Sequence, residues 1–140
     1  MPLPGFHAFM VLIDNSGNTW NETMLTWEFR AGPTKDNDNL FASMSPLIGA
    51  QDNVKGSVYS INVQNNNCSC QPEVNKLLQT AKNINASNIP YSNAFPSTNS
   101  NAAVTTGLSD LGLSYPTSSQ LPWKVRPLPG WGTPLPITSH

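Results

Sequence analysis

Charged residues are scarce in this chain of 140 residues: 11% are Asp, Glu, Lys or Arg, and the formal net charge is -1. No cluster of Lys and Arg is available to neutralise phosphates, which argues against a nucleic-acid-binding protein. No stretch approaches the roughly 20 apolar residues that a transmembrane helix needs, so we expect no membrane span. The N-terminus lacks the features of a secretory signal peptide. The compartment stays open between the cytoplasm and export by a non-classical route.

Cysteine is equally rare, since the chain contains only Cys68 and Cys70, one residue apart. A disulfide at this spacing would be strained. Two thiols without nearby histidines are too few for a structural zinc site. The sequence also has no Walker loop, dinucleotide fingerprint or HExxH motif. We therefore expect free thiols, no metal and no cofactor.

Asparagine, serine and threonine supply the polarity that charge does not, and asparagine alone fills 17 positions. The length favours one domain with a substantial core. From Pro116 onward, six prolines and the tryptophans Trp123 and Trp131 leave little room for regular structure. We predict a single α+β domain over residues 1–115, with residues 116–140 forming an irregular tail rich in proline and tryptophan that packs on the same domain.

The strand signals indicate a small antiparallel sheet. Residues 6–13 and 19–30 are rich in strand-forming residues and are separated by the turn formers of residues 14–18, a pattern that predicts a hairpin. Residues 56–64 alternate apolar and polar side chains most clearly. Residues 40–50 are apolar without a clean period, and we assign them no element. The sheet is expected to have three or more strands.

Two helices are expected to pack against this sheet, over residues 72–85 and 100–111. The first carries a stripe at helical spacing, composed of Val74, Leu77, Leu78, Ala81 and Ile84. The second contains Thr105, Thr106 and Gly107, all of which weaken a helix by intrinsic propensity. Packing against the rest of the protein must therefore hold the second helix in place.

A histidine in the first strand and a serine at the start of the second helix could carry chemistry. His7 is a candidate general base, and Ser100, flanked by Asn99 and Asn101, is a candidate nucleophile. A helix N-terminus carries about half a positive charge and exposed N–H groups. Such a position can stabilise the oxyanion of acyl transfer.

The order of these features resembles the circularly permuted papain-like (NlpC/P60-like) hydrolases. The resemblance rests on short motifs within residues 6–113, namely Phe6-His7-Ala8-Phe9, Phe29-Arg30-Ala31-Gly32-Pro33, Ile89-Pro90-Tyr91 and Asn99-Ser100-Asn101. It implies a hydrolase or acyltransferase acting on an amide or ester bond of a peptide or peptidoglycan-type substrate. The family has cysteine where this chain has Ser100. The serine fits a serine-type enzyme, a replaced cysteine or a member that has lost catalysis.

A third group should orient the imidazole, and Glu28 and Asn62 are the candidates. Whether Glu28 faces His7 depends on the register of the hairpin, because a slip of one residue reverses its face. Simpler interpretations remain for each residue. Ser100 could be a helix N-cap, His7 an inert strand histidine, and Glu28 a solvated strand residue.

The alternative function is a non-catalytic structural or interaction module, such as a virion or filament subunit or a secreted binding domain with a degenerate site. Low charge, abundant Asn and Ser, and a proline-rich tail suit such a protein. The enzyme requires a Ser100 hydroxyl within about 4 Å of a His7 ring nitrogen. Nothing in the sequence indicates an oligomeric state.

Overall fold

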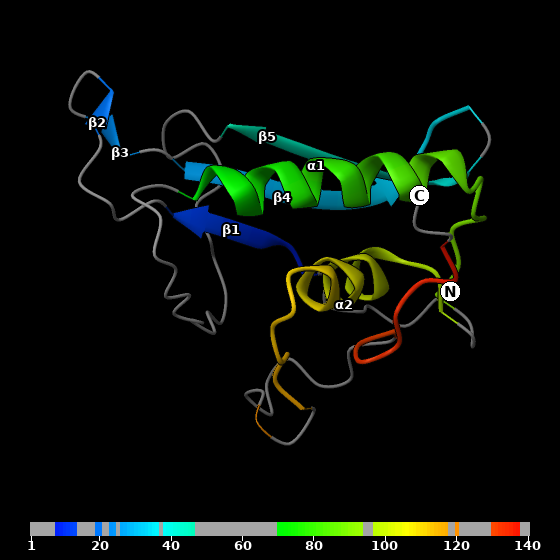
Figure 1. Ribbon diagram of the computed structural model, residues 1–140. Coiled ribbons are helices and arrows are strands. Elements are labelled where there is room, and N and C mark those ends of the chain that lie inside the picture. Colours follow the sequence, from blue (N-terminus) through cyan, green and yellow to red (C-terminus); the bar gives the residue numbers. More distant parts are fainter. Residues whose placement is uncertain are drawn as a thin grey trace.

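The computed structural model describes residues 8–13, 19–20, 23–24, 26–36, 38–46, 70–93, 97–117, 120 and 130–137. These residues form an α+β fold in which two helices pack against one face of a three-stranded antiparallel sheet (Figure 1). The strand order is β1 (Met10–Ile13), β4 (Thr26–Pro33) and β5 (Leu40–Pro46). The predicted fold class, with a small antiparallel sheet and two helices, is confirmed. The strand predicted over residues 56–64 lies outside the described residues.

The first two predicted strands do pair in antiparallel fashion, as β1 and β4, with Val11 opposite Glu28. The prediction of one continuous strand over residues 19–30 is wrong. Within that range, β2 (Thr19–Trp20) pairs antiparallel with β3 (Thr23–Met24), and β4 begins only at Thr26. Because antiparallel partners run in opposite directions, the chain reverses between β2 and β3.

Strand β5 occupies a region to which the sequence pattern assigned no element. Its burial alternates, with Leu40, Ala42 and Met44 buried and the residues between them exposed. The alternation is hidden in the sequence because an aromatic residue, Phe41, takes an exposed position and the small Ala42 takes a buried one. Phe41 is 50% exposed. Pairing with β4 and packing against α1 therefore determine the formation of β5 more than the hydropathy of its sequence does.

The outer edge of β5 is bonded to the end of α1 (Gln71–Ala86) and to the segment that follows. The Asn85 side chain accepts a hydrogen bond from the Ala42 N–H (2.7 Å) and donates one to the Ala42 carbonyl (2.9 Å). The Leu40 N–H donates to the Ile89 carbonyl (2.7 Å). These bonds satisfy main-chain groups that would otherwise face outward from the sheet.

Helix α1 forms where the sequence predicted it, with one apolar face on the sheet. Its buried apolar residues are Val74, Leu77, Ala81 and Ile84. The second predicted helix is α2 (Ser100–Asp110), which ends before Gly112, a glycine with φ +72°. Residues Ser100 to Leu108 are all buried.

Gly107 explains how α2 approaches the sheet so closely. A Cβ on Gly107 would lie 3.2 Å from the Leu77 and Met10 side chains and 3.5 Å from the Phe29 ring. The glycine that weakens the helix by propensity therefore leaves room for α1, β1 and β4 to meet α2 in the core.

The described part of the C-terminal segment, residues 130–137, packs along α2 (Figure 1). Leu135 is buried in the same core as the two helices. The Gly132 N–H donates to Thr105 Oγ1 (3.1 Å), and the Leu135 N–H donates to Thr106 Oγ1 (2.7 Å). The two threonines that weaken the helix by propensity thus bind a distant part of the chain.

Candidate functional site: the N-terminal turn of α2

The first turn of α2 is capped by Asn99. The Asn99 side-chain oxygen accepts a hydrogen bond from the Ala102 N–H (3.1 Å), and the Asn99 carbonyl accepts one from the Ala103 N–H (3.0 Å). Its side-chain nitrogen donates to Asn93 Oδ1 (3.0 Å). The interpretation of Ser100 as the helix cap is therefore wrong, because its neighbour fills that position.

Ser100 is the first residue of α2 and lies on the same side of the helix as Gly107. Residues seven apart share a face of an α-helix, and Gly107 contacts β1 and β4. The Ser100 side chain is thus directed toward the sheet side of α2. It is 3% exposed, so a substrate can reach its hydroxyl only if the residues that cover it move.

A side-chain hydrogen bond joins the segment just before β1 to the first turn of α2. The Ala8 N–H donates to Asn101 Oδ1 (2.8 Å) across 93 residues of sequence. Asn101 is 1% exposed and Ala8 is half-buried, so the bond is partly shielded from water. The residue after His7 in the chain is therefore bonded to the residue after Ser100.

Glu28 lies on the other face of the sheet. Its neighbours Trp27 and Phe29 belong to the core packed by the helices, and alternation along β4 turns Glu28 to the opposite face. Its carboxylate is paired with the Arg30 guanidinium, two residues along the same strand. Glu28 is 7% exposed. The structure does not bring Glu28 and Ser100 together.

The described residues bring Ser100, Asn99 and Asn101 together at one end of α2, near the beginning of β1. His7 and Asn62, the predicted base and the second candidate for its orienting group, lie outside the described residues. Gly130 also reaches this end of the helix, which the sequence reasoning missed. A Cβ on Gly130 would lie 2.6 Å from Asn99 Oδ1. A possible signal is the Gly130-Trp131-Gly132 sequence, which interrupts the proline-rich segment.

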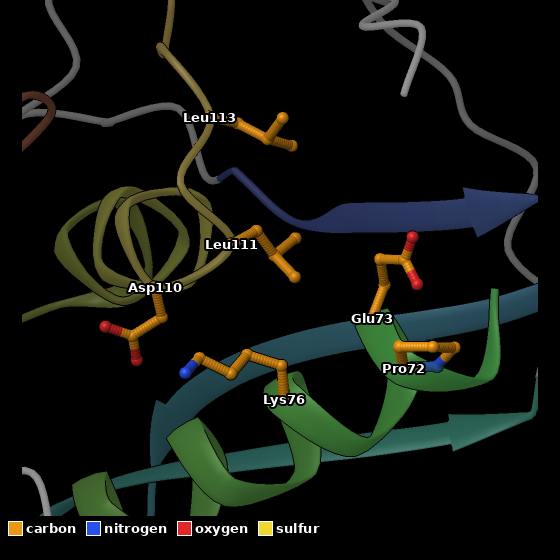
Figure 2. Close-up of a pocket in the computed structure, with 6 residues that line it drawn as sticks. All are labelled: Pro72, Glu73, Lys76, Asp110, Leu111 and Leu113. Atoms are coloured by element: carbon orange, nitrogen blue, oxygen red, sulfur yellow. The ribbon is translucent and has the colours of Figure 1, made fainter. Parts of the chain in front are cut away.

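A cavity of about 260 Å³ lies at the other end of α2 (Figure 2). It is lined by Pro72, Glu73, Lys76, Asp110, Leu111 and Leu113. Figure 2 shows that the Lys76 ammonium extends toward the side on which the Asp110 carboxylate lies. Ser100 and Asp110 are separated by about 15 Å along the helix axis. This cavity is therefore separate from the predicted catalytic residues.

Among the described residues, no group of three or more His, Cys, Asp or Glu is placed to hold a metal ion. The same part of the chain contains no helix with the length and apolar character needed to cross a bilayer. A scan against protein-family models finds no match to the chain, and searches of curated proteins and of solved structures find none either. The function must therefore be inferred from the chain's own chemistry.

Proposed function

We propose that this chain is a permuted papain-like hydrolase or acyltransferase that acts on an amide or ester bond, with Ser100 as nucleophile and His7 as general base. The observation that carries the proposal is the hydrogen bond from Ala8 to Asn101. It joins the two segments that supply the base and the nucleophile, although they are far apart in the sequence. The substrate class, a peptide or peptidoglycan-type acyl group, comes from the resemblance to the papain-like hydrolases.

The reaction follows from the chemistry of a serine at a helix N-terminus. An alcohol is not ionised there, so Ser100 Oγ must lose its proton to the His7 imidazole as it attacks the carbonyl carbon. The imidazolium then protonates the leaving amine or alcohol, and water or another nucleophile releases the acyl group from Ser100. The Ala102 and Ala103 amides are engaged by Asn99. The proposal places the oxyanion near the main-chain N–H groups around Ser100.

The proposal also requires a particular path of the main chain before β1. The residues Ala8, Met10 and Leu12 pack against the core that the helices cover. In a regular strand, an odd-numbered residue would point to the opposite face. His7 can thus meet Ser100 only if the main chain before Met10 departs from strict strand alternation. Glu28 and Asn62 both stay candidates for the orienting group, and Glu28 could serve only if the imidazole also reaches the face of the sheet away from α2.

The proposal is tested by labelling with a fluorophosphonate probe and by hydrolysis of an activated nitrophenyl ester. We expect the wild-type chain to be labelled, and the variants Ser100→Ala and His7→Ala to react at least about a hundredfold more slowly, the usual contribution of general base catalysis. Ser109→Ala is the matched control, because Ser109 is an exposed serine of the same helix. Labelling of Ser100→Ala at the wild-type rate, or no labelling of any variant, would exclude a serine enzyme.

The variant Ser100→Cys tests whether Ser100 replaces the cysteine of a working site or belongs to a site that has lost catalysis. A thiol at a helix N-terminus has a lowered pKa and reacts quickly as the thiolate. In a background with Cys68→Ser and Cys70→Ser, we expect the thiol of Ser100→Cys to have a lower pKa than a cysteine placed at Ser109. The pH dependence of iodoacetamide alkylation gives this comparison, because the burial of position 100 slows the absolute rate. Equal pKa values would remove the case for an activated position.

The burial of the site favours a second candidate, a non-catalytic structural or interaction module. Ser100, Asn99 and Asn101 are each at most 3% exposed, and the two asparagines hold the first turn of α2 and the start of β1. In this case the three residues would serve the fold alone. The fluorophosphonate probe would then label neither the wild type nor Ser100→Ala.

A further inference from the structure

The C-terminal residues 130–135 contact the first turn of α2 through two threonine hydroxyls. Thr105 Oγ1 donates to the Asn101 carbonyl (2.9 Å), and Thr106 Oγ1 donates to the Ala102 carbonyl (2.8 Å). The same oxygens accept the tail N–H groups described above. Each hydroxyl thus joins the main chain of the tail to a carbonyl of the first turn.

The tail covers a side of α2 largely opposite to the sheet. At 100° per residue, Thr105 lies about 160° around the helix from Gly107, the residue that contacts the sheet. Helix α2 is therefore held between β1 and β4 on one side and residues 130–135 on the other. Contacts on both sides of the helix contribute to the burial of residues 100–108, all of which are buried.

Gly130 lies close to the N-cap residue Asn99. Its φ of +86° suits glycine, and an added Cβ would lie 2.6 Å from Asn99 Oδ1 and 3.0 Å from the Ser97 Cβ. Asn99 Oδ1 is the atom that accepts the Ala102 N–H. The main chain of Gly130 thus confines the side chain that caps the helix.

We propose that residues 130–135 form a clamp that fixes the N-cap of α2 and thereby positions Ser100, with Gly130 as its positioning residue. Asn99 is bonded covalently to Ser100, so a displaced cap also displaces the nucleophile. The catalytic part of this inference rests on the proposed function, whereas the clamp itself does not. A shift of about 1 Å in a reacting group can slow a reaction by about a hundredfold.

The experiment compares three glycines that share a positive φ. Gly130, Gly132 and Gly112 have φ values of +86°, +82° and +72°, so an alanine at each suffers similar backbone strain. An added Cβ has its nearest neighbour at 3.8 Å at Gly132 and none within 4 Å at Gly112. Only Gly130→Ala forces a collision with the cap. Gly112→Ala, which lies outside the clamp, is the matched control, whereas Gly132→Ala disturbs a second residue of the clamp.

Amide hydrogen exchange reports the clamp without reference to activity. In Gly130→Ala we expect the Ala102 amide to exchange about tenfold faster, the effect of losing a helix cap. The amides of α1 should keep their wild-type rates. Gly112→Ala should leave the Ala102 rate within about threefold of the wild type, since strain alone does not remove the cap. Unchanged exchange at Ala102, or equal acceleration of all amides, would overturn the clamp.

Fluorophosphonate labelling then tests the positioning of Ser100. We expect Gly130→Ala to be labelled about tenfold more slowly than Gly112→Ala, because its reacting group is displaced. If neither the wild type nor any variant is labelled while Ala102 responds as expected, the proposed function fails and the clamp stands. If Ala102 responds but labelling of Gly130→Ala matches the wild type, the positioning role is overturned.

The variant Thr106→Val gives the same test if Gly130→Ala does not fold. It keeps the shape of the side chain and removes the oxygen that accepts the Leu135 N–H. We expect faster exchange at Ala102 and slower labelling of Ser100 than in Thr117→Val, whose threonine is exposed and lies outside α2. Wild-type exchange at Ala102 in Thr106→Val would count against the clamp.

Discussion

Helix α1 buries one stripe of its surface, whereas α2 is buried on all sides from Ser100 to Leu108. The polar residues Gln71, Asn75 and Lys76 of α1 face solvent. In α2, by contrast, Asn101, Thr105 and Thr106 are buried, and their side chains form hydrogen bonds with Ala8 before β1, with the tail and within the helix itself. The first helix is thus specified by local amphipathicity, and the second by contacts with distant segments. The proposed chemistry belongs to the second helix.

The largest expected effect on stability comes from filling the space at Gly107. Gly107→Leu favours the helix by propensity but forces a bulky side chain against Leu77, Met10 and Phe29. We expect a loss of about 3 kcal/mol in the free energy of unfolding, measured by urea denaturation. Gly32→Ala, whose added Cβ would meet nothing within 4 Å, is the control and should change little. Tolerance of leucine at 107 would mean that α2 does not rest on the sheet.

A smaller effect on stability is expected from removing a buried asparagine of α2, compared with removing an exposed asparagine of α1. Asn101→Ala leaves the half-buried Ala8 N–H without its acceptor, which we expect to cost about 2 kcal/mol. Asn75→Ala in α1 removes only an exposed bond with Gln71 and should change stability by less than about 0.5 kcal/mol. Chemical denaturation of both variants gives the comparison. Equal effects would show that burial does not distinguish the two helices.

The bond between the helices gives a third test. Thr80 of α1 donates to Asp110 Oδ2 of α2 at 2.6 Å, and Thr80 is 1% exposed. We expect Thr80→Val to reduce stability by about 1 kcal/mol, the usual net contribution of a hydrogen bond. A double-mutant cycle with Asp110→Ala isolates the pair. Additive effects of the two substitutions would indicate that this bond does not couple α1 to α2.

The smallest effect concerns Tyr91, in the segment between the helices, and it appears only at high pH. Burial raises the pKa of Tyr91 above its ordinary value of 10.0. The unfolded chain therefore loses this proton first, so the stability that Tyr91 contributes is complete below about pH 10 and declines as the pH rises through its folded pKa. Tyr91→Phe should make the loss of stability above that pH less steep. An identical alkaline decline in both proteins would contradict the assignment.

Sequence alone could predict α1 because the signal is local: Val74, Leu77, Ala81 and Ile84 repeat at the helical period. It could not predict β5, whose register against β4 decides which side chains are buried. The face of Glu28 was undecidable for the same reason. Once Val11 is opposite Glu28, the carboxylate lies on the face away from α2.

The start of α2 was predicted at the correct residue, Ser100, but its cap was not. Residues Ser97, Thr98, Asn99 and Ser100 are all good N-cap residues, so propensity does not choose among them. Asn99, which forms the cap, differs from the other three in its contacts to Asn93 and Gly130, which lie 6 and 31 positions away. The bond between Ala8 and Asn101 spans 93 positions and has no local signature. Such contacts depend on the folded topology rather than on any sequence window.

The bonds from Asn85 and Ile89 to β5 have a consequence for self-association. An open sheet edge offers its main chain as a template for a strand of another molecule, which is a route to aggregation. Here the Asn85 carboxamide bonds both the N–H and the carbonyl of Ala42. The Leu40 N–H is bonded to the Ile89 carbonyl in the loop after α1. A second copy of the chain would have to displace the end of α1 before it could extend the sheet at these two residues. The protein thus carries its own protection against polymerisation at this part of the edge.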